Sequence, residues 1–181
     1  RLPYSGYFDF GANRYYIQVP RDYDQHRQYP LIIFLHGRGA DGVSSDINVV
    51  TEDYGPFRQQ AQDRGFILAG PLYGTDSWMN ASGEQIILDL VQFLAQNLSV
   101  DRARIYLMGK SMGGGAALTF TTLHPEMVAA VCDLCGVTDF LLFYREGRYQ
   151  ESLSGAFGGG PDEQADVYRE RSSAHNTHRL V

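Results

Sequence analysis

The sequence has little of several features that mark special classes of protein. Its 181 residues include two cysteines and one tryptophan, and no apolar run reaches the length of about 18 residues that a membrane span requires. Positive charge is also in deficit, because 15 Lys and Arg stand against 21 Asp and Glu, a formal net charge of −6. This balance disfavours nucleic acid as a partner. The chain starts at Arg1 and not at Met, so its N-terminus leaves the compartment unknown.

The two cysteines, Cys132 and Cys135, are close in sequence but poorly placed for a bond. In extended chain they point to opposite faces, too far apart for a comfortable disulfide. A lone C-x-x-C also has too few ligands for a metal ion. We therefore expect two buried thiols, no metal site and no cofactor.

The hydrophobic content of 44% and the charged content of 20% predict a single globular domain over residues 1–181. Apolar runs and alternating patterns predict strands near residues 5–10, 14–19, 31–35, 66–69, 104–108 and 127–134. Helical spacing predicts helices near 54–64, 82–98, 112–124 and 162–171, with a capping box at residues 82–85 and an irregular aromatic segment from residue 138. This order, a hairpin with a turn at 11–13 followed by alternating strands and helices, predicts an α/β fold. Its central sheet is mostly parallel, with helices on both faces.

The most informative stretch is G-K-S-M-G, residues 109–113, between an apolar strand and a small-residue helix. At a sharp strand-to-helix turn, Ser111 is held in a strained conformation with its hydroxyl beyond the sheet edge. A Cβ at Gly109 or Gly113 would collide across so tight a turn. The start of the helix also aims free N–H groups at negative charge that develops beside the hydroxyl.

A second stretch follows the buried strand at 31–35, where a glycine-rich loop runs from His36 to Gly42. It lies at the carboxyl end of that strand, where open α/β sheets place their sites.

These stretches together resemble the α/β-hydrolase-fold serine esterases, in particular the group that includes feruloyl and acetyl esterases and polyester depolymerases. The residues that carry the resemblance are Pro30–Leu35 with His36-Gly37-x-Gly39, and Val100-Asp101-x-x-Arg104 with the run up to Gly109-x-Ser111-Met112-Gly113-Gly114. The resemblance extends from about Tyr15 to Asp139, and it implies an eight-stranded fold with a Ser–His–Asp triad.

The resemblance implies that Ser111 is the nucleophile and that the backbone N–H of Met112 is one oxyanion donor. The second donor comes from the His36-Gly37-Arg38 loop, with the Arg38 N–H favoured. His36 itself precedes the nucleophile, against the chain order of the fold, so we expect it to support the loop by hydrogen bonding. Two further aromatic residues stay open between two roles, walling the substrate pocket or covering the sheet edge: Tyr73 and Trp78.

The chain departs from the family after the sixth strand, because no Asp with a later His follows recognisable strands beyond residue 139. We expect that the last two strand–helix units, with the acid and base, are missing from this chain. A second chain or segment would then complete the sheet. The compact alternative takes Asp139 as the acid and His175 or His178 as the base.

The favoured function is hydrolysis of a small or polymer-linked carboxylic ester through an acyl-enzyme on Ser111. One alternative keeps the elbow but cleaves peptides, as in prolyl oligopeptidases, which usually carry an upstream propeller domain. The other is a non-catalytic hydrolase-fold binding module.

Overall fold

The computed structural model describes residues 5–11, 13–39 and 54–180. In this part of the chain, six strands form one sheet in the order β1-β2-β4-β3-β5-β6. The strands are β1 (Ser5–Phe10), β2 (Asn13–Gln18), β3 (Tyr29–Leu35), β4 (Ile67–Pro71), β5 (Val100–Lys110) and β6 (Ala130–Leu134). The α-helices are α1 (Gly55–Asp63), α2 (Ala81–Asn97), α3 (Met112–Leu123), α4 (Phe140–Arg145), α5 (Gln150–Phe157) and α6 (Ala165–Arg171). Ala12 of the expected hairpin turn and residues 40–42 of the glycine-rich loop lie outside the described residues.

The sheet is parallel where the βα alternation predicts it to be. Strands β4, β3, β5 and β6 run parallel, whereas β1 and β2 form an antiparallel hairpin whose second strand pairs antiparallel with β4. This confirms the predicted α/β architecture, because a parallel pair needs a helical crossover and an antiparallel pair does not.

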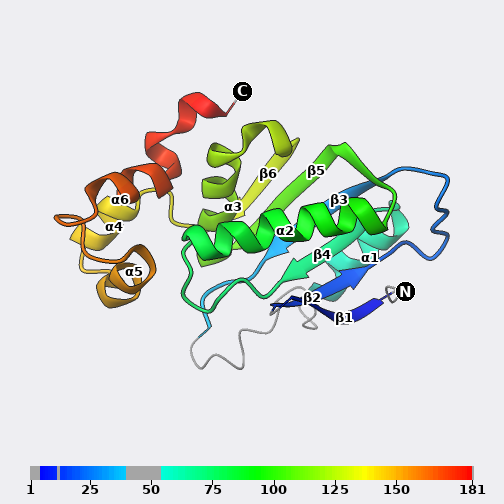
Figure 1. Ribbon diagram of the computed structural model, residues 1–181, viewed down its shortest axis with the longest axis horizontal. Helices are drawn as coiled ribbons and strands as arrows, with labels where there is room; N and C mark the ends of the chain where they lie inside the picture. Colours follow the sequence, from blue (N-terminus) through cyan, green and yellow to red (C-terminus); the bar gives the residue numbers. More distant parts are fainter. Residues whose placement is uncertain (1–4, 12, 40–53, 181) are drawn as a thin grey trace.

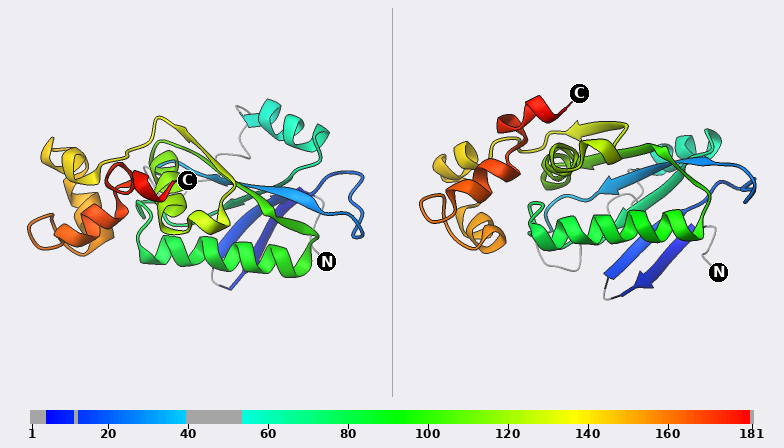
Figure 2. Two further views of the ribbon diagram at one scale, coloured as in Figure 1. Left: turned by 90° about the horizontal axis from the view of Figure 1, so that it is seen from above. Right: turned by 45° about the horizontal axis from the view of Figure 1, so that its top comes forward.

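Helices cover both faces of the sheet, and the alternation along β3 shows why. Leu31, Ile33 and Leu35 pack into the main core with α2 and α3. Phe34 points to the opposite face and packs with Ala61 of α1 in a smaller cluster. Figure 2 shows α1 on the side of the sheet opposite to α2 and α3. A continuous apolar strand is typical of a sheet buried on both faces.

The segment after β6 contains three short helices, where the sequence had predicted an irregular aromatic stretch and a single helix. Figure 1 shows α4, α5 and α6 grouped beyond the carboxyl ends of the parallel strands. Their apolar residues pack on one another and on the main core, with Phe140, Leu153 and Tyr168 fully buried. The prediction of an irregular segment was wrong because these helices are too short for a clear helical period.

The start of α2 differs from the predicted capping box. Asn80, two residues earlier than Ser82, caps the helix by accepting a hydrogen bond from the Gly83 N–H at 2.9 Å. Glu84 instead accepts hydrogen bonds from Arg171 Nη1 (2.5 Å) and His124 Nε2 (2.8 Å). Its carboxylate therefore ties α2 to the end of α3 and to α6.

Strand β6 forms one edge of the sheet, and this position decides the state of the cysteines. Within the described residues β6 pairs with β5 alone. Cys132 and Cys135 are both free and exposed, so the expectation of buried thiols was wrong. An outer strand leaves side chains accessible that a neighbouring strand and its helix would cover.

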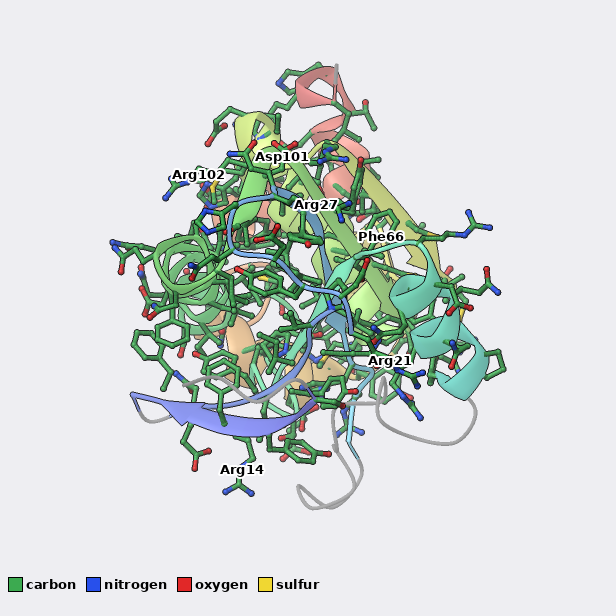
Figure 3. All side chains as sticks on the ribbon, turned by 90° about the vertical axis from the view of Figure 1, so that its right-hand side faces the viewer. Arg14, Arg21, Arg27, Phe66, Asp101 and Arg102 are labelled. Carbon is green, nitrogen blue, oxygen red and sulfur yellow. The ribbon has the colours of Figure 1, made fainter. Side chains whose placement is uncertain are left out.

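Figure 3 views the molecule from the end that carries the amino termini of the parallel strands, with Arg27, Asp101 and Arg102 labelled. Among the residues that the structure describes, no helix is long and apolar enough to cross a membrane. Likewise, the described ranges hold no group of three His, Cys, Asp or Glu side chains suited to a metal ion.

Candidate active site

Ser111 is the single residue between the end of β5 and the start of α3. Its backbone has φ 56° and ψ −120°, a conformation that costs a non-glycine residue of the order of 1–3 kcal/mol. The strained turn is held from outside, because the Ser111 N–H donates to the Leu134 carbonyl at the end of β6 at 2.9 Å. Ser111 remains exposed. The strand–turn–helix geometry predicted from the pentapeptide is therefore present.

Gly109 and Gly113 allow this turn because neither position has room for a side chain. A Cβ at Gly109 would lie 2.1 Å from the Gly113 carbonyl oxygen. A Cβ at Gly113 would lie 2.1 Å from the Leu35 carbonyl oxygen and 2.5 Å from that of His36. The start of α3 thus rests directly on the end of β3, which places the loop after β3 beside the elbow.

The first turn of α3 includes one backbone donor, that of Met112, without an acceptor among the described residues. The N–H groups of Gly114 and Gly115 donate to the Ser111 carbonyl at 3.0 and 3.2 Å. The N–H of Met112 has no acceptor among the described residues, as expected at the first position of a helix. Because Met112 follows Ser111 directly and its side chain is fully buried, this N–H is a donor fixed beside the hydroxyl.

His36 is buried at the beginning of the loop after β3. Its Nδ1 donates to the Gly37 carbonyl at 2.7 Å, and its Nε2 has no partner within the described residues. Burial lowers the pKa of His36 and so favours the neutral ring, with the Gly37 hydrogen bond acting in the opposite direction. These contacts fit a residue that supports the loop. Among the described contacts, none joins His36 to Ser111.

Arg38 extends from the same loop toward the loop after β4. Its guanidinium forms an ion pair with Asp76 and lies over the ring of Tyr149, 5.1 Å from the centroid. Its backbone N–H has no acceptor within the described part of the chain. The N–H is therefore available as the second oxyanion donor that the resemblance implies.

Tyr73 and Trp78 both belong to the main core, although Tyr73 also reaches a cavity. Tyr73 is 1% exposed and donates from its hydroxyl to the His36 carbonyl at 2.9 Å, and burial raises its pKa. Trp78 is 2% exposed and donates from Nε1 to Ser152 Oγ at 2.6 Å. Neither residue lies on an edge strand of the sheet. Their role as pocket walls stays a prediction.

A cavity of about 830 Å³ opens beside the Arg38 loop. Its walls come from the loop after β4, the start of α2 and α5, and include Arg38, Tyr73, Asp76, Tyr149 and Ser152. No sequence motif pointed to Asp76 or Ser152, which are 76 positions apart and meet only in the folded chain.

The acid and imidazole of the compact alternative do meet, but they do not reach the serine. Asp139 Oδ2 lies 3.2 Å from His175 Nε2, while its Oδ1 caps α4 by accepting from the Leu142 N–H. No hydrogen bond in the described residues joins Ser111 Oγ to His175 or to His178. The pair therefore links the loop after β6 to the C-terminal segment.

The strained serine at a strand–helix junction, set in a mostly parallel sheet with helices on both faces, defines an α/β-hydrolase-fold protein. Residues 77–181 match the model of the prolyl oligopeptidase family. The chain belongs to this family.

The curated relatives that the chain matches are named feruloyl esterases. The chain is 25% identical over 134 residues to a probable feruloyl esterase C from Aspergillus flavus, covering 73% of this chain and 49% of the relative. It is 28% identical over 139 residues to feruloyl esterase C from Emericella nidulans, with the same coverage. The chain thus spans about half the length of the curated relatives it matches.

Two solved structures show the same fold at low identity. One is assigned as a dipeptidyl aminopeptidase IV from Bacteroides ovatus, with a TM-score of 0.73 and 17% identity over 97% of this chain and 26% of its own. The other is Est1E from Butyrivibrio proteoclasticus, with a TM-score of 0.61 and 17% identity over 80% of this chain and 55% of its own.

Proposed function

We propose that the protein hydrolyses carboxylic esters through an acyl-enzyme on Ser111. The observation that carries this proposal is the strained, exposed Ser111 at the junction of β5 and α3. A non-glycine residue keeps such a backbone only where the surroundings enforce it, and these positions cluster at active sites. A conventional turn would place a glycine or asparagine there.

In the proposed reaction, Ser111 Oγ attacks the ester carbonyl carbon while a general base takes its proton. The carbonyl oxygen becomes an oxyanion that accepts hydrogen bonds from the N–H groups of Met112 and Arg38. The C–O bond to the alcohol then breaks, and the alcohol leaves with the proton from the base. Water, deprotonated by the same base, then attacks the acyl carbon. The bond between this carbon and Ser111 Oγ breaks, Ser111 Oγ takes the proton from the base, and the acid leaves.

The base and its carboxylate are proposed to come from a segment that completes the sheet beyond β6. Two observations support this. The outer side of β6 pairs with no strand among the described residues, and the chain covers about half the length of the curated relatives it matches. Whether the segment belongs to the same protein or to a second copy, it would bring an imidazole about 3 Å from Ser111 Oγ.

Ester substrates are favoured over peptides because the curated relatives that match 73% of the chain are named feruloyl esterases. Peptide hydrolysis is the second candidate, because the family model and the Bacteroides ovatus structure carry peptidase names. A non-catalytic binding module is the third candidate. The backbone donors beside Ser111 that have no acceptor in the described residues are evidence against it.

The test is labelling of the intact protein with a fluorophosphonate, followed by peptide mapping. We expect a single modified residue, Ser111. Ser111→Ala should abolish both labelling and hydrolysis of p-nitrophenyl acetate and methyl ferulate, while the matched variant Ser154→Ala on α5 keeps both. A fully active Ser111→Ala variant would refute the assignment.

The same preparation separates the ester from the peptide hypothesis. We expect kcat/KM for methyl ferulate to exceed that for glycyl-prolyl p-nitroanilide by at least about 100-fold, since an ester is the easier acyl donor and the pocket is proposed to suit it. A higher kcat/KM for the peptide substrate than for the ester would support the peptidase hypothesis instead.

A further inference from the structure

The loop after β3, which carries the proposed oxyanion donor, is held in place by the loop after β4. The Tyr73 hydroxyl donates to the His36 carbonyl at 2.9 Å. The Gly39 N–H donates to the Thr75 carbonyl at 3.3 Å. These two bonds hold the loop on either side of residues 37 and 38, one near each end of its described part.

Between these two bonds, a series of side-chain contacts connects the loop to α5. The Asp76 carboxylate accepts from Arg38 Nε and, at 3.5 Å, from Nη2. The same Asp76 Oδ1 accepts from Ser152 Oγ at 2.7 Å, and Ser152 Oγ accepts from the buried Trp78 Nε1 at 2.6 Å. The Arg38 guanidinium also lies over the Tyr149 ring, 5.1 Å from its centroid. The Arg38 side chain is thus held by two residues, Asp76 and Tyr149, and Asp76 is itself held by Ser152.

This arrangement contributes more to geometry than to stability. The side chains of Arg38 and Asp76 are 34% and 38% exposed, and ion pairs at such sites typically add about 0–1 kcal/mol. However, two contacts to one carboxylate and an orienting serine restrict the rotamers of both partners. An oxyanion hole depends on such restriction, because its donors act only when they are already in position.

We propose that Asp76 is a positioning residue: through the Arg38 guanidinium it fixes the backbone N–H of Arg38 toward the oxyanion formed at Ser111. The proposal rests on the proposed function and assigns a role to a residue that the sequence motifs do not indicate. Asp76 touches neither the substrate nor the reacting atoms in this role.

The test is a double-mutant cycle in the intact protein with p-nitrophenyl acetate. Asp76→Asn keeps the size of the side chain and removes its charge, and Arg38→Met removes the guanidinium but keeps the backbone N–H. We expect each variant to lower kcat about 10- to 100-fold, less than the 10²–10³-fold loss on deleting an oxyanion donor, with KM unchanged. The double variant should be no slower than the slower single variant, because both changes break the same contact.

The matched control is Asp101→Asn, which breaks the Asp101–Arg104 ion pair (2.6 Å) at the other end of β5. The pair lies at the amino end of β5, and the extended part of the strand from Ile105 to Ser111 alone spans roughly 20 Å. The control should keep the wild-type kcat, and all variants should melt within a few degrees of wild type. Three outcomes would overturn the proposal: unchanged kcat in Asp76→Asn, a raised KM that indicates direct substrate contact, or additive losses in the double variant. A failure of the proposed function is distinct, because it would appear as an active Ser111→Ala variant.

Discussion

Gly113→Ala is the sharpest perturbation of the elbow that the structure offers. The added methyl group would lie 2.1 Å from the Leu35 carbonyl oxygen and 2.5 Å from the His36 carbonyl oxygen. Real Cβ contacts essentially never fall below 3.0 Å, so helix and strand must separate by almost 1 Å. Both obstructing atoms are backbone atoms of the β3 end, which no side-chain rotation can move away.

The free-energy cost of Gly113→Ala depends on the backbone that has to move. Overpacking a close-packed site costs about 1–3 kcal/mol and occasionally more, and a clash with backbone belongs at the upper end. For a chain of this length, about 3 kcal/mol lowers the melting temperature by roughly 6–12 °C. Activity should fall further than stability indicates, because the displaced backbone leads into the loop with the proposed oxyanion donor, and an error of about 1 Å costs about 100-fold in rate.

Gly155→Ala on α5 is the matched control, because a Cβ there meets nothing within 4 Å. Removing a glycine from the interior of a helix should raise the unfolding free energy by about 0.5–1 kcal/mol. Both variants are compared with wild type by calorimetry and by hydrolysis of p-nitrophenyl acetate. If Gly113→Ala melts and reacts like wild type, the close approach of α3 to β3 does not exist as described.

Three further predictions concern ionisable side chains. Burial lowers the pKa of His36 below its usual 6.5, so the unfolded chain binds the extra proton and stability is lost as the pH falls below about 6.5; nitrogen NMR should find that the His36 ring titrates below 6.5, and a titration at or above 6.5 would contradict this. Glu84→Gln should lower the unfolding free energy by about 3 kcal/mol, because the Arg171 side chain, 10% exposed, loses its partner; urea titration measures the loss, and Glu170→Gln, on an exposed residue of α6, should change little. His175→Ala should leave ester hydrolysis within about twofold of wild type, since no hydrogen bond in the described part of the chain joins His175 to Ser111; a loss of more than about 100-fold would establish the compact triad instead.

Much of the fold and the centre of the site could be predicted from local sequence. The apolar run before His36 and the G-K-S-M-G pentapeptide each specify their own geometry, since a strained serine flanked by two glycines needs only its immediate neighbours to be recognised. The predicted parallel sheet with a leading hairpin is confirmed for the same reason, because strand and helix periods differ clearly over four to ten residues. The roles of Ser111, Met112 and Arg38 in catalysis stay predictions.

Tertiary structure alone decided the remaining features. Glu84, which the sequence pattern assigned to a helix cap, instead bonds to Arg171 and His124, because a partly buried carboxylate is stabilised most by the cations that the fold brings to it. The thiols of Cys132 and Cys135 are exposed because β6 is an edge strand, and no local pattern tells an edge strand from a central one. The contact of Asp76 with Arg38 and Ser152 joins three segments far apart in sequence. Such contacts depend on how the loops after β3 and β4 and helix α5 pack together, and a one-dimensional pattern carries no information on that packing.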